Sequence, residues 1–505
     1  MNVVFRADAT SQIGTGHFMR CMTLAEELKQ RDVHIRFVSR DLPEYLCDML
    51  AAKGIEFVAL ESGATPLPVG DLAHSHWLNA SQEQDAQATK QALSDRTWDW
   101  LVVDHYALDA RWESALRSSV GQIMAIDDIA DRHHDCDVLL DQNLYTNMQE
   151  RYEGKVPTHC HLLLGPRYAL LRDEFREARK RARQRSGRIK RILVFFGGMD
   201  AANYTGRAIE ALAGLEIKAL QVDVIIGMQH PCREQIEALC ESHGYHCHVQ
   251  TKHMAELMTN ADLAIGAGGS AMWERCCLGL PALSICVADN QRKQIADAAE
   301  QGLIYALASD DSLASVLQRH TKSLLENASL LKLISRTAMQ EVDGLGVNRV
   351  ASALGASSIE IRMANESDSP KLFEWRNHQS IREASKNSAP IAWGNHQSWF
   401  AGVQIDKNRM LLIGRLKNQP IGVVRFDKEG ETALVSIYLV PDGGFKGQGC
   451  NLLLRAEEWL KAHCADIKWI RADVLGANTA SQRLLASADY RLESMHYLKE
   501  LRKNG

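Results

Sequence analysis

The chain has 505 residues, of which 46% are hydrophobic and 24% are charged, and its formal net charge is −5. This composition indicates a soluble globular protein with two or three domains. The small negative charge gives no support to a nucleic-acid-binding protein or to a protein of anionic membrane surfaces.

The first residues, MNVVFRAD, lack a basic segment followed by an apolar one, so we expect no secretory signal. The apolar runs have the length of strands, which predicts no membrane-spanning helix. The 12 cysteines form no CxxC pair, which indicates reduced thiols and a cytoplasmic protein. The dense cluster DRHHDCD, residues 131–137, lacks the spacing of a metal site. We therefore expect a polar loop there and no metal.

Short apolar runs alternate with helical patterns as far as about residue 340, which predicts buried parallel strands separated by helices. A basic run, 176–191, separates two sets and is expected to be a solvated helix face or a connector. The pattern predicts two doubly wound α/β halves, residues 1–175 and 186–340, with a cleft between them. The expected strands are 3–5, 35–38, 101–103, 123–126 and 138–140 in the first set, and 192–196, 222–226, 263–265 and 283–287 in the second.

After residue 340 the sequence changes character. Residues 341–358 are rich in small side chains and predict a closing helix and a linker. Residues 359–505 then predict a separate α+β domain, because their strands follow one another at hairpin spacing. We expect strands at 410–416, 421–426, 432–440 and 469–474, and helices that begin near residues 450 and 478.

A glycine-containing loop follows the first strand and opens a helix expected at 18–29. Gly14, Thr15 and Gly16 lie there at the carboxyl edge of the sheet, where open α/β sheets bind ligands. His17 follows directly, and a helix N-terminus disfavours the imidazolium cation. A neutral imidazole at this place is suited to act as a general base. The alternative is that His17 only begins the helix.

The second half contains a matching arrangement. A strand, the turn GAGGS and a helix follow one another, so Gly268, Gly269 and Ser270 can offer hydrogen-bond donors to a diphosphate. Glu274, one helical turn further, can accept hydrogen bonds from ribose hydroxyls. Gly197 and Gly198 stand at another strand end that faces the same expected cleft.

Taken together, these motifs resemble the GT-B sugar-nucleotide enzymes. Within them the chain is most similar to the PseG family, the UDP-2,4-diacetamido-2,4,6-trideoxy-β-L-altropyranose hydrolases of pseudaminic acid biosynthesis. The resemblance extends over residues 1–355 and is carried in order by FRAD, GTGHFMR, VVDHY, IDD, LLDQN, LGPRYALLRDEF, FFGGMD, GAGGSAMWE, ADNQ and DGLG.

The resemblance implies that His17 is the catalytic base, that it activates water at the sugar C1, and that no metal takes part. The implied sugar-binding residues are Gly14, Thr15, Gly16, Arg20, Tyr106, Asn290 and Gln291. The implied UDP-binding residues are Gly197, Gly198, His253, Met254, Gly268, Gly269, Ser270 and Glu274.

The C-terminal domain has its own glycine loop, in which Gly447 and Gly449 precede a helix and suit a pyrophosphate. With NTASQRLLASADY, 478–490, this loop resembles the GNAT acyltransferases, and residues 375–400 resemble the PseH-type amino-sugar N-acetyltransferases. The resemblance implies that the domain binds acetyl-CoA and acetylates the 4-amino group of the UDP-sugar precursor. The implied acetyl-CoA-binding residues are Val440, Lys446, Gly447, Gly449 and Asn478.

This domain departs from the GNAT pattern at three points. Gly444 replaces the arginine or glutamine of the loop, Leu485 replaces the usual general-acid tyrosine, and Asp489-Tyr490 replaces a Gly-Phe pair. The proton donor therefore stays open between Tyr490 and Tyr497, and the base between Glu383 and a water chain.

Three functions follow as hypotheses. The first is a bifunctional enzyme that takes a UDP-linked amino sugar and acetyl-CoA as substrates. The second is a UDP-sugar-dependent glycosyltransferase of the MurG type. The third is a nucleotide-sugar sensor whose C-terminal domain is an interaction module. None of the three involves nucleic acid or membrane insertion.

Overall fold

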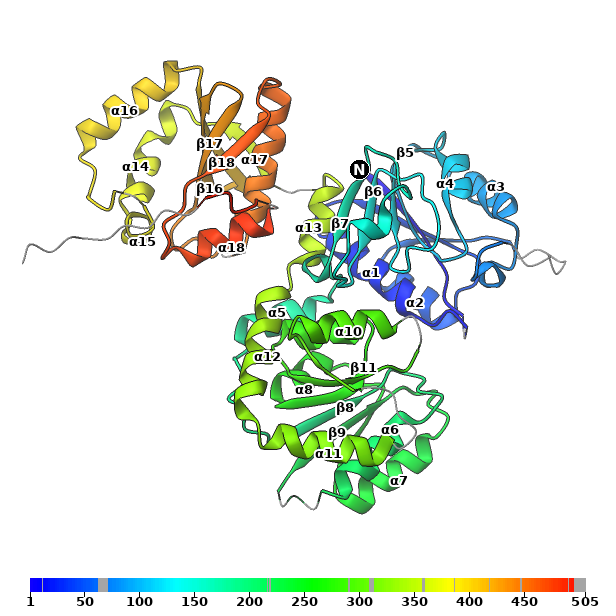
Figure 1. Ribbon diagram of the computed structural model, residues 1–505. Helices are drawn as coiled ribbons and strands as arrows, with labels where there is room; N and C mark the ends of the chain where they lie inside the picture. Colours follow the sequence, from blue (N-terminus) through cyan, green and yellow to red (C-terminus); the bar gives the residue numbers. More distant parts are fainter. Residues whose placement is uncertain are drawn as a thin grey trace, which may run out of the picture. The chain divides into compact units, whose positions relative to one another are not determined.

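The computed structural model (Figure 1) describes residues 1–10, 12–61, 71–215, 217, 219–288, 291–307, 313–356, 359–385, 387–416, 418–445, 447–488 and 490–494. The chain divides into two compact units, Met1–Leu354 and Gly355–Gly505. Among the described residues, no helix combines the length and the apolar character needed to cross a membrane.

The first unit begins with a seven-stranded parallel sheet in the order β3-β2-β1-β4-β5-β6-β7. Helices connect its strands as far as β5, as expected for parallel pairing, whereas residues 127–137 join β5 to β6 without a helix. We call this part the first half. Its elements are β1 Asn2–Ala7, α1 Gly16–Lys29, β2 His34–Ser39, α2 Glu44–Ala52, β3 Glu56–Ala59, η1 Ser75–Trp77, α3 Gln82–Ala92, β4 Trp98–Asp104, α4 Ala110–Leu116, β5 Val120–Ile126, β6 Val138–Asp141, η2 Glu150–Tyr152, β7 His161–Leu164 and η3 Pro166–Tyr168.

The second half of this unit holds a six-stranded parallel sheet in the order β10-β9-β8-β11-β12-β13. Successive residues of β8, Leu193 and Val194, join two separate core clusters, so both faces of the sheet are covered. Figure 1 shows α6, α7 and α11 on one face and α8 and α10 on the other. The elements are α5 Asp173–Arg181, β8 Arg191–Phe195, α6 Tyr204–Ala213, β9 Gln221–Ile226, α7 Arg233–His243, β10 His246–Val249, α8 Met254–Asn260, β11 Leu263–Ala267, α9 Ser270–Cys277, β12 Ala282–Ile285, α10 Arg292–Glu300, β13 Tyr305–Ala306, α11 Leu313–Leu325 and α12 Ala328–Glu341.

The last helix of the unit, α13 (Gly346–Ala353), returns to the first half. It packs on α1, where Asn348 donates a hydrogen bond of 2.7 Å to Glu27. The predicted fold class, a GT-B-like pair of Rossmann-type halves followed by an α+β unit, is confirmed.

The second unit has a five-stranded sheet in the order β14-β15-β16-β17-β18. Its pairings are antiparallel except for β17 with β18, which are parallel and joined through α17. This mixed sheet is the one expected of a GNAT-like unit. The elements are β14 Ile359–Met363, η5 Glu366–Asp368, α14 Ser369–Asn377, α15 Gln379–Glu383, α16 Trp393–Ile405, β15 Arg409–Leu416, β16 Gln419–Glu429, β17 Thr432–Leu439, α17 Gly449–His463, β18 Trp469–Ala472 and α18 Thr479–Ser487.

The basic run, 176–191, differs in part from the expected solvated connector. It contains the end of α5 and then a loop, but Arg185 is only 2% exposed. Its guanidinium donates to the carbonyls of Met258, Thr259, Ala261 and Leu278. These carbonyls end α8 and α9, where the backbone leaves acceptors unsatisfied. Arg185 is thus a buried cation that completes two helix C-termini.

Candidate functional site

The predicted loops of the first unit lie where the strand order of each sheet reverses. In the first sheet, β1 lies beside both β2 and β4, and in the second sheet β8 lies beside both β9 and β11. Successive connections leave such a point on opposite sides, which opens a crevice for ligands at the carboxyl ends of the strands. His17 follows β1, whereas the glycine pairs 197–198 and 268–269 follow β8 and β11.

His17 and Arg20 both contact Asp104, the last residue of β4. His17 Nδ1 lies 2.5 Å from Asp104 Oδ1, and Arg20 donates to both carboxylate oxygens at 2.6 and 2.7 Å. Burial alone would raise the pKa of Asp104, but Arg20 and His17 hold it well below its usual range. A carboxylate oxygen only accepts, so the proton sits on Nδ1 of His17. In the neutral ring the lone pair is then on Nε2, which has no partner among the described residues.

An aromatic wall, made of Tyr106, Trp77 and His74, stands beside His17. The Tyr106 ring lies edge-on at 4.5 Å from the imidazole and stacks with Trp77 at 5.6 Å, and His74 lies 4.6 Å from Trp77. Burial raises the pKa of the Tyr106 phenol, whose hydroxyl donates to Asp128. His17 therefore lies between an aromatic face and a buried charged group made of Asp104 and Arg20, where polar contacts are strengthened.

The motif FRAD forms a second charged network at the same edge of the sheet. Arg6 contacts Asp8 at 2.6 Å and Asp85 at 2.8 Å, and all three side chains are buried. His105, the neighbour of Asp104, places its Nε2 3.3 Å from Asp8. This network joins the ends of β1 and β4, so it fixes the strands that carry His17 and Asp104.

The predicted sugar loop is open. Gly14 has φ +74°, and a Cβ at Gly14 or Gly16 would meet no atom within 4 Å. The N-cap residue of α1, Thr15, makes no side-chain hydrogen bond to the helix. The first turn of α1 therefore offers backbone N–H groups that no side chain has claimed.

On the nucleotide side, Gln291 lies against the glycine pair. Gly269 has φ +76°, and a Cβ on Gly268 would lie 3.3 Å from Gln291 Oε1. This oxygen is buried and accepts no hydrogen bond from the described residues. Ser270 begins α9 and is exposed, with no side-chain cap before it. The loop thus presents free donors beside one unsatisfied acceptor.

Glu274 has a partner in this structure. Arg172 Nη2 lies 3.3 Å from its Oε1, and burial raises the pKa of the Glu274 carboxyl. Gly197 has φ +104°, and a Cβ at Gly197 or Gly198 would meet nothing within 4 Å. The two glycines leave open space at the end of β8, and Glu274 places a carboxyl group one turn along α9.

The other predicted residues of the first unit are placed differently. His253 is exposed at the start of α8, but Met254 is only 7% exposed and packs into the core of the second half. Its side chain contributes packing, so only its backbone faces outward. Asn290 lies outside the described residues.

The cluster DRHHDCD forms a buried ion network. His134 Nδ1 lies 2.8 Å from Glu113, its Nε2 lies 3.6 Å from Asp127, and Arg132 contacts Asp127 at 2.9 Å. Burial alone would lower the pKa of His134, but the two carboxylates raise it to about 9. Within the described ranges, no group of three or more His, Cys, Asp or Glu side chains is arranged to hold a metal ion.

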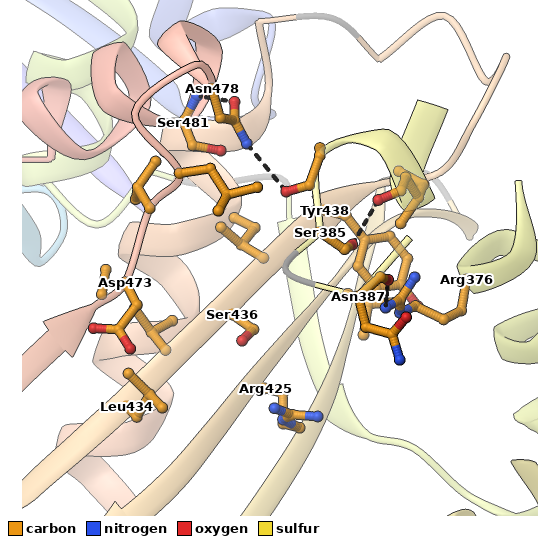
Figure 2. A pocket seen from close by; sticks show the side chains of 18 of the residues that line it. Arg376, Ser385, Asn387, Arg425, Leu434, Ser436, Tyr438, Asp473, Asn478 and Ser481 are labelled. Atoms are coloured by element: carbon orange, nitrogen blue, oxygen red, sulfur yellow. Dashed lines mark hydrogen bonds between the residues drawn. The ribbon is translucent and has the colours of Figure 1, made fainter. Parts of the chain in front are cut away.

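The second unit contains a cavity of about 550 Å³ bordered by β17, the end of β18, the start of α18 and helices α14 and α16 (Figure 2). Asn478 lines it and caps α18 by accepting a hydrogen bond of 3.0 Å from Ser481 N. Gly447 has φ +93° with open space around its Cβ position, whereas a Cβ on Gly449 would lie 2.5 Å from Leu484. Val440, Gly447 and Gly449 stand outside this lining, and Lys446 lies outside the described residues.

Two arginines and a tyrosine face this cavity from one side (Figure 2). Arg376 Nη1 and Arg425 Nε are buried and have no hydrogen-bond partner among the described residues. Burial raises the pKa of the Tyr438 phenol, although the two cations act in the opposite direction. Leaving such donors unsatisfied costs about 1–3 kcal/mol each, which favours an anionic occupant.

The proton donor of the second unit stays undetermined. Leu485 lines the cavity and has no proton to give. The Tyr490 hydroxyl donates instead to Glu457 at 2.8 Å, and neither Tyr490 nor Glu383 is among the described residues that line the cavity. Tyr497 lies outside the described residues.

Four residues of the first unit escaped the sequence analysis. Asp104 and Asp128 stand at or just after the carboxyl ends of β4 and β5, and that position at a strand end was the available signal. Asn143 ends the motif LLDQN and was not singled out within it, and Trp77 gave no local signal, because its ring contact comes from a distant part of the chain.

Comparison with known proteins relates the first unit to nucleotide-sugar enzymes. Residues 191–344 match the family model of the Glycosyltransferase family 28 C-terminal domain. The UDP-2,4-diacetamido-2,4,6-trideoxy-beta-L-altropyranose hydrolase of Campylobacter jejuni subsp. jejuni is 25% identical over 304 residues, which are 60% of this chain and 97% of that protein.

Two solved structures match parts of the chain. Acinetobacter baumannii MurG matches with a TM-score of 0.49 and 17% identity, over 70% of this chain and 99% of that one. Aminoglycoside acetyltransferase AAC(6′)-Ib in complex with coenzyme A matches with a TM-score of 0.24 and 18% identity, over 27% of this chain and 85% of that one. The relatives of the first unit are nucleotide-sugar-processing proteins.

Replacing Asp104 tests the charge arrangement around His17. In Asp104→Asn, Arg20 loses one of its two carboxylate partners and keeps Asp128, so we expect the free energy of unfolding to fall by about 1–3 kcal/mol. The Nδ1 proton of His17 also loses its carboxylate acceptor. Denaturant titration measures the first effect, and ¹⁵N-histidine NMR measures the second as a change of tautomer. Unchanged spectra and stability would contradict the arrangement.

The ion network of His134 predicts a pH dependence of stability. Because folding raises this pKa from about 6.5 to about 9, the histidine stabilises the folded state fully below pH 6.5. That contribution, about 3 kcal/mol, is lost as the pH rises through 9. Denaturant titrations from about pH 6 to pH 10 should show the loss in the wild type and in the exposed neighbour variant His133→Gln, but not in His134→Gln.

Proposed function

We propose that the first unit is a UDP-sugar hydrolase in which His17 activates the attacking water. The observation that carries the proposal is the His17–Asp104 pair at the switch point of the first sheet, with Nε2 unpartnered. The hydrolase relative from Campylobacter jejuni supports it, because that protein is matched over nearly its whole length. The proposed products are UDP and 2,4-diacetamido-2,4,6-trideoxy-L-altrose.

The proposed reaction is a displacement at the sugar C1. Nε2 of His17 takes a proton from water as the water oxygen forms its bond to C1, and the C1–O bond to the diphosphate breaks. The electron pair of that bond goes to the β-phosphate oxygen of UDP. Asp104 accepts the hydrogen bond from Nδ1–H throughout and stabilises the imidazolium that forms.

The second half would hold UDP. Backbone N–H groups at Gly268, Gly269 and Ser270, with the dipole of α9, suit the diphosphate charge that grows as the bond breaks. Glu274 would exchange its contact with Arg172 for the ribose hydroxyls. Gln291 Oε1, which lacks a partner, would accept a hydrogen bond from the sugar.

A UDP-sugar-dependent glycosyltransferase is the second candidate, because residues 191–344 match a glycosyltransferase family model. The two differ in the group that attacks C1. A glycosyltransferase would place an acceptor hydroxyl where the hydrolase places water, so UDP release would accelerate with an acceptor. Release that is as fast in water alone supports the hydrolase.

We propose that the second unit acetylates the 4-amino group of the UDP-sugar precursor with acetyl-CoA. The amine nitrogen attacks the acetyl carbon, the C–S bond breaks, and the CoA thiolate takes up one proton while the nitrogen loses one. The unsatisfied nitrogens of Arg376 and Arg425 support an acceptor that carries phosphate. Its product would be the substrate of the first unit.

Substitution of His17 tests the base. In His17→Asn, hydrolysis should fall by about 10²–10⁴-fold, the usual cost of losing a general base, with UDP affinity unchanged. NMR of the released sugar and calorimetry with UDP measure the two quantities, and His133→Gln is the matched control. Hydrolysis in ¹⁸O-water should label the sugar. A wild-type rate in the variant, or label in UDP, would refute the mechanism.

A glycine pair tests the acetyl-CoA loop. Gly447→Val forces a β-branched residue into φ +93°, so the loop must change and acetyl-CoA affinity should fall at least about tenfold. Gly430→Val strains a hairpin tip at φ +66° in the same unit and is the matched control. Gly449→Val is less clean because it also displaces Leu484. Calorimetry measures the affinity for acetyl-CoA in each variant. A hydrolysis assay serves as the control, since hydrolysis by the first unit should persist in all three variants.

No heat of acetyl-CoA binding to the wild-type protein would reduce the second unit to an interaction module. Equal affinity in Gly447→Val and Gly430→Val would place the acetyl-CoA site elsewhere.

A further inference from the structure

Asn143 connects the two halves of the first unit through its side-chain amide. It follows β6 and is 8% exposed. Its Oδ1 accepts hydrogen bonds from Trp273 Nε1 at 3.0 Å and from Gln294 Nε2 at 2.8 Å. Trp273 lies on α9 and Gln294 on α10, so both donors belong to the second half.

The other end of the same amide reaches the His17 site. Asn143 Nδ2 donates to Asp128 Oδ2 at 3.3 Å. The same oxygen accepts from Arg20 Nη1 at 2.9 Å, and the other oxygen accepts from the Tyr106 hydroxyl. Arg20 in turn holds Asp104, the partner of His17. A continuous chain of hydrogen bonds therefore runs from α9 to the imidazole.

The chemistry of the neighbours determines the orientation of this amide. An indole nitrogen only donates and a carboxylate oxygen only accepts, so Oδ1 must face Trp273 and Nδ2 must face Asp128. A carboxylate at position 143 would meet Asp128 as a like charge, and a hydrocarbon would serve neither side. Among ordinary side chains of this size, the amide alone serves both partners.

The ends of this chain are the two places where ligand is proposed to bind. Trp273 stands three residues after Ser270, on the helix that begins at the diphosphate loop, and is 0% exposed. It cannot shift without moving Asn143, because packed interiors do not deform freely. A displacement of α9 is thus passed to Asp128 and Arg20.

We propose that Asn143 is a positioning residue that sets the geometry of the Arg20–Asp104–His17 group from the nucleotide-binding half. The inference rests on the hydrolase function proposed above. Asn143 touches neither water nor sugar in this scheme. It acts through Asp128, so its loss should lower kcat rather than weaken UDP binding.

The structure offers a matched control. Asp297, on α10, accepts a hydrogen bond of 3.0 Å from Thr146 N and so also joins the two halves. It has no contact with Asp128. Asp297→Ala therefore removes a contact between the halves without touching the hydrogen-bond chain, and we expect its kcat to stay near that of the wild type.

Two substitutions of Asn143 distinguish the effect of its hydrogen bonds on Asp128 from the effect of its packing. Asn143→Leu keeps the branched shape of the side chain and removes all three of its hydrogen bonds, so kcat should fall by about 10–100-fold with KM within about threefold, as for other residues that orient a reactive group through a neighbour. Asn143→Asp keeps the acceptor for Trp273 but opposes Asp128. At neutral pH the kcat of Asn143→Asp should fall as far as that of Asn143→Leu.

The pH profile distinguishes the two variants. Two facing carboxyls share a proton at low pH, and the protonated one donates again. The ratio of kcat in Asn143→Asp to kcat in the wild type should therefore rise toward low pH, whereas the ratio for Asn143→Leu should stay flat. The charged and titratable groups around this pair are Arg20, Tyr106, Asp141, Tyr145 and Arg151 in the first half and Lys293 and Asp297 in the second.

A readout without turnover keeps this inference apart from the hydrolase proposal. The Nδ1 proton of His17, identified by its absence in His17→Gln, reports the hydrogen bond to Asp104 by ¹H NMR. Its signal should move in Asn143→Leu and stay in Asp297→Ala. If the wild type hydrolyses nothing but the signal moves as expected, the hydrolase proposal fails and the positioning role stands.

The opposite results overturn the inference. An unmoved His17 signal in both Asn143 variants shows that the amide does not position the site. Equal losses of kcat in Asn143→Leu and Asp297→Ala would make Asn143 an ordinary contact between the halves. Thermal unfolding of each variant shows that it is folded before either comparison is made.

Discussion

The buried carboxylate of Asp104 sets the geometry of the first unit. A charge removed from water is tolerated only where partners satisfy its oxygens, and here Arg20 and His17 do so. These two residues are three positions apart on α1, so they share one face of the helix. The helix must therefore begin immediately after the loop from β1, and Gly14 supplies the positive φ of +74° that this turn requires.

The two halves solve different electrostatic problems with the same topology. At the switch point of the first sheet, His17 can take up a proton transiently, because the carboxylate of Asp104 accepts a hydrogen bond from its Nδ1. At the switch point of the second sheet, the glycine loops offer neutral donors, which suit a diphosphate that keeps its charge. In the proposed hydrolase, backbone donors and a helix dipole would bind UDP after cleavage more weakly than a cationic side chain among those glycines would.

The central strands of both sheets could be read from the sequence, but the edges could not. Strands such as β4 and β11 are continuous apolar runs because helices cover both of their faces. The edge strands β3, β7 and β10 are four residues long and partly exposed, so their sequences EFVA, HLLL and HCHV lack that signature. A short mixed run predicts a strand no better than it predicts a loop.

The same limit applies to the site. Glycine loops and His17 are local signals, since a strand, a turn and a helix start follow one another in the sequence. The hydrogen bond from Trp273 to Asn143 joins residues 130 positions apart, and no local pattern announces it. Arg185 was expected to be solvated for the same reason, because the carbonyls that hold it belong to α8 and α9.

The second unit shows how unsatisfied groups carry information about an absent ligand. Arg376 Nη1 and Arg425 Nε are buried donors without a hydrogen-bond partner among the described residues. The free-energy cost of removing these two nitrogens from water is therefore not offset within the unit. Phosphate oxygens would offset this cost by accepting hydrogen bonds, since guanidinium groups match them in charge and shape. Leu485, by contrast, removes a proton donor from the same cavity and leaves no unsatisfied group behind. Under the proposed acetylation, an anionic acceptor would satisfy these donors, and the proton that reaches the departing thiolate would come from a group other than the residue at position 485.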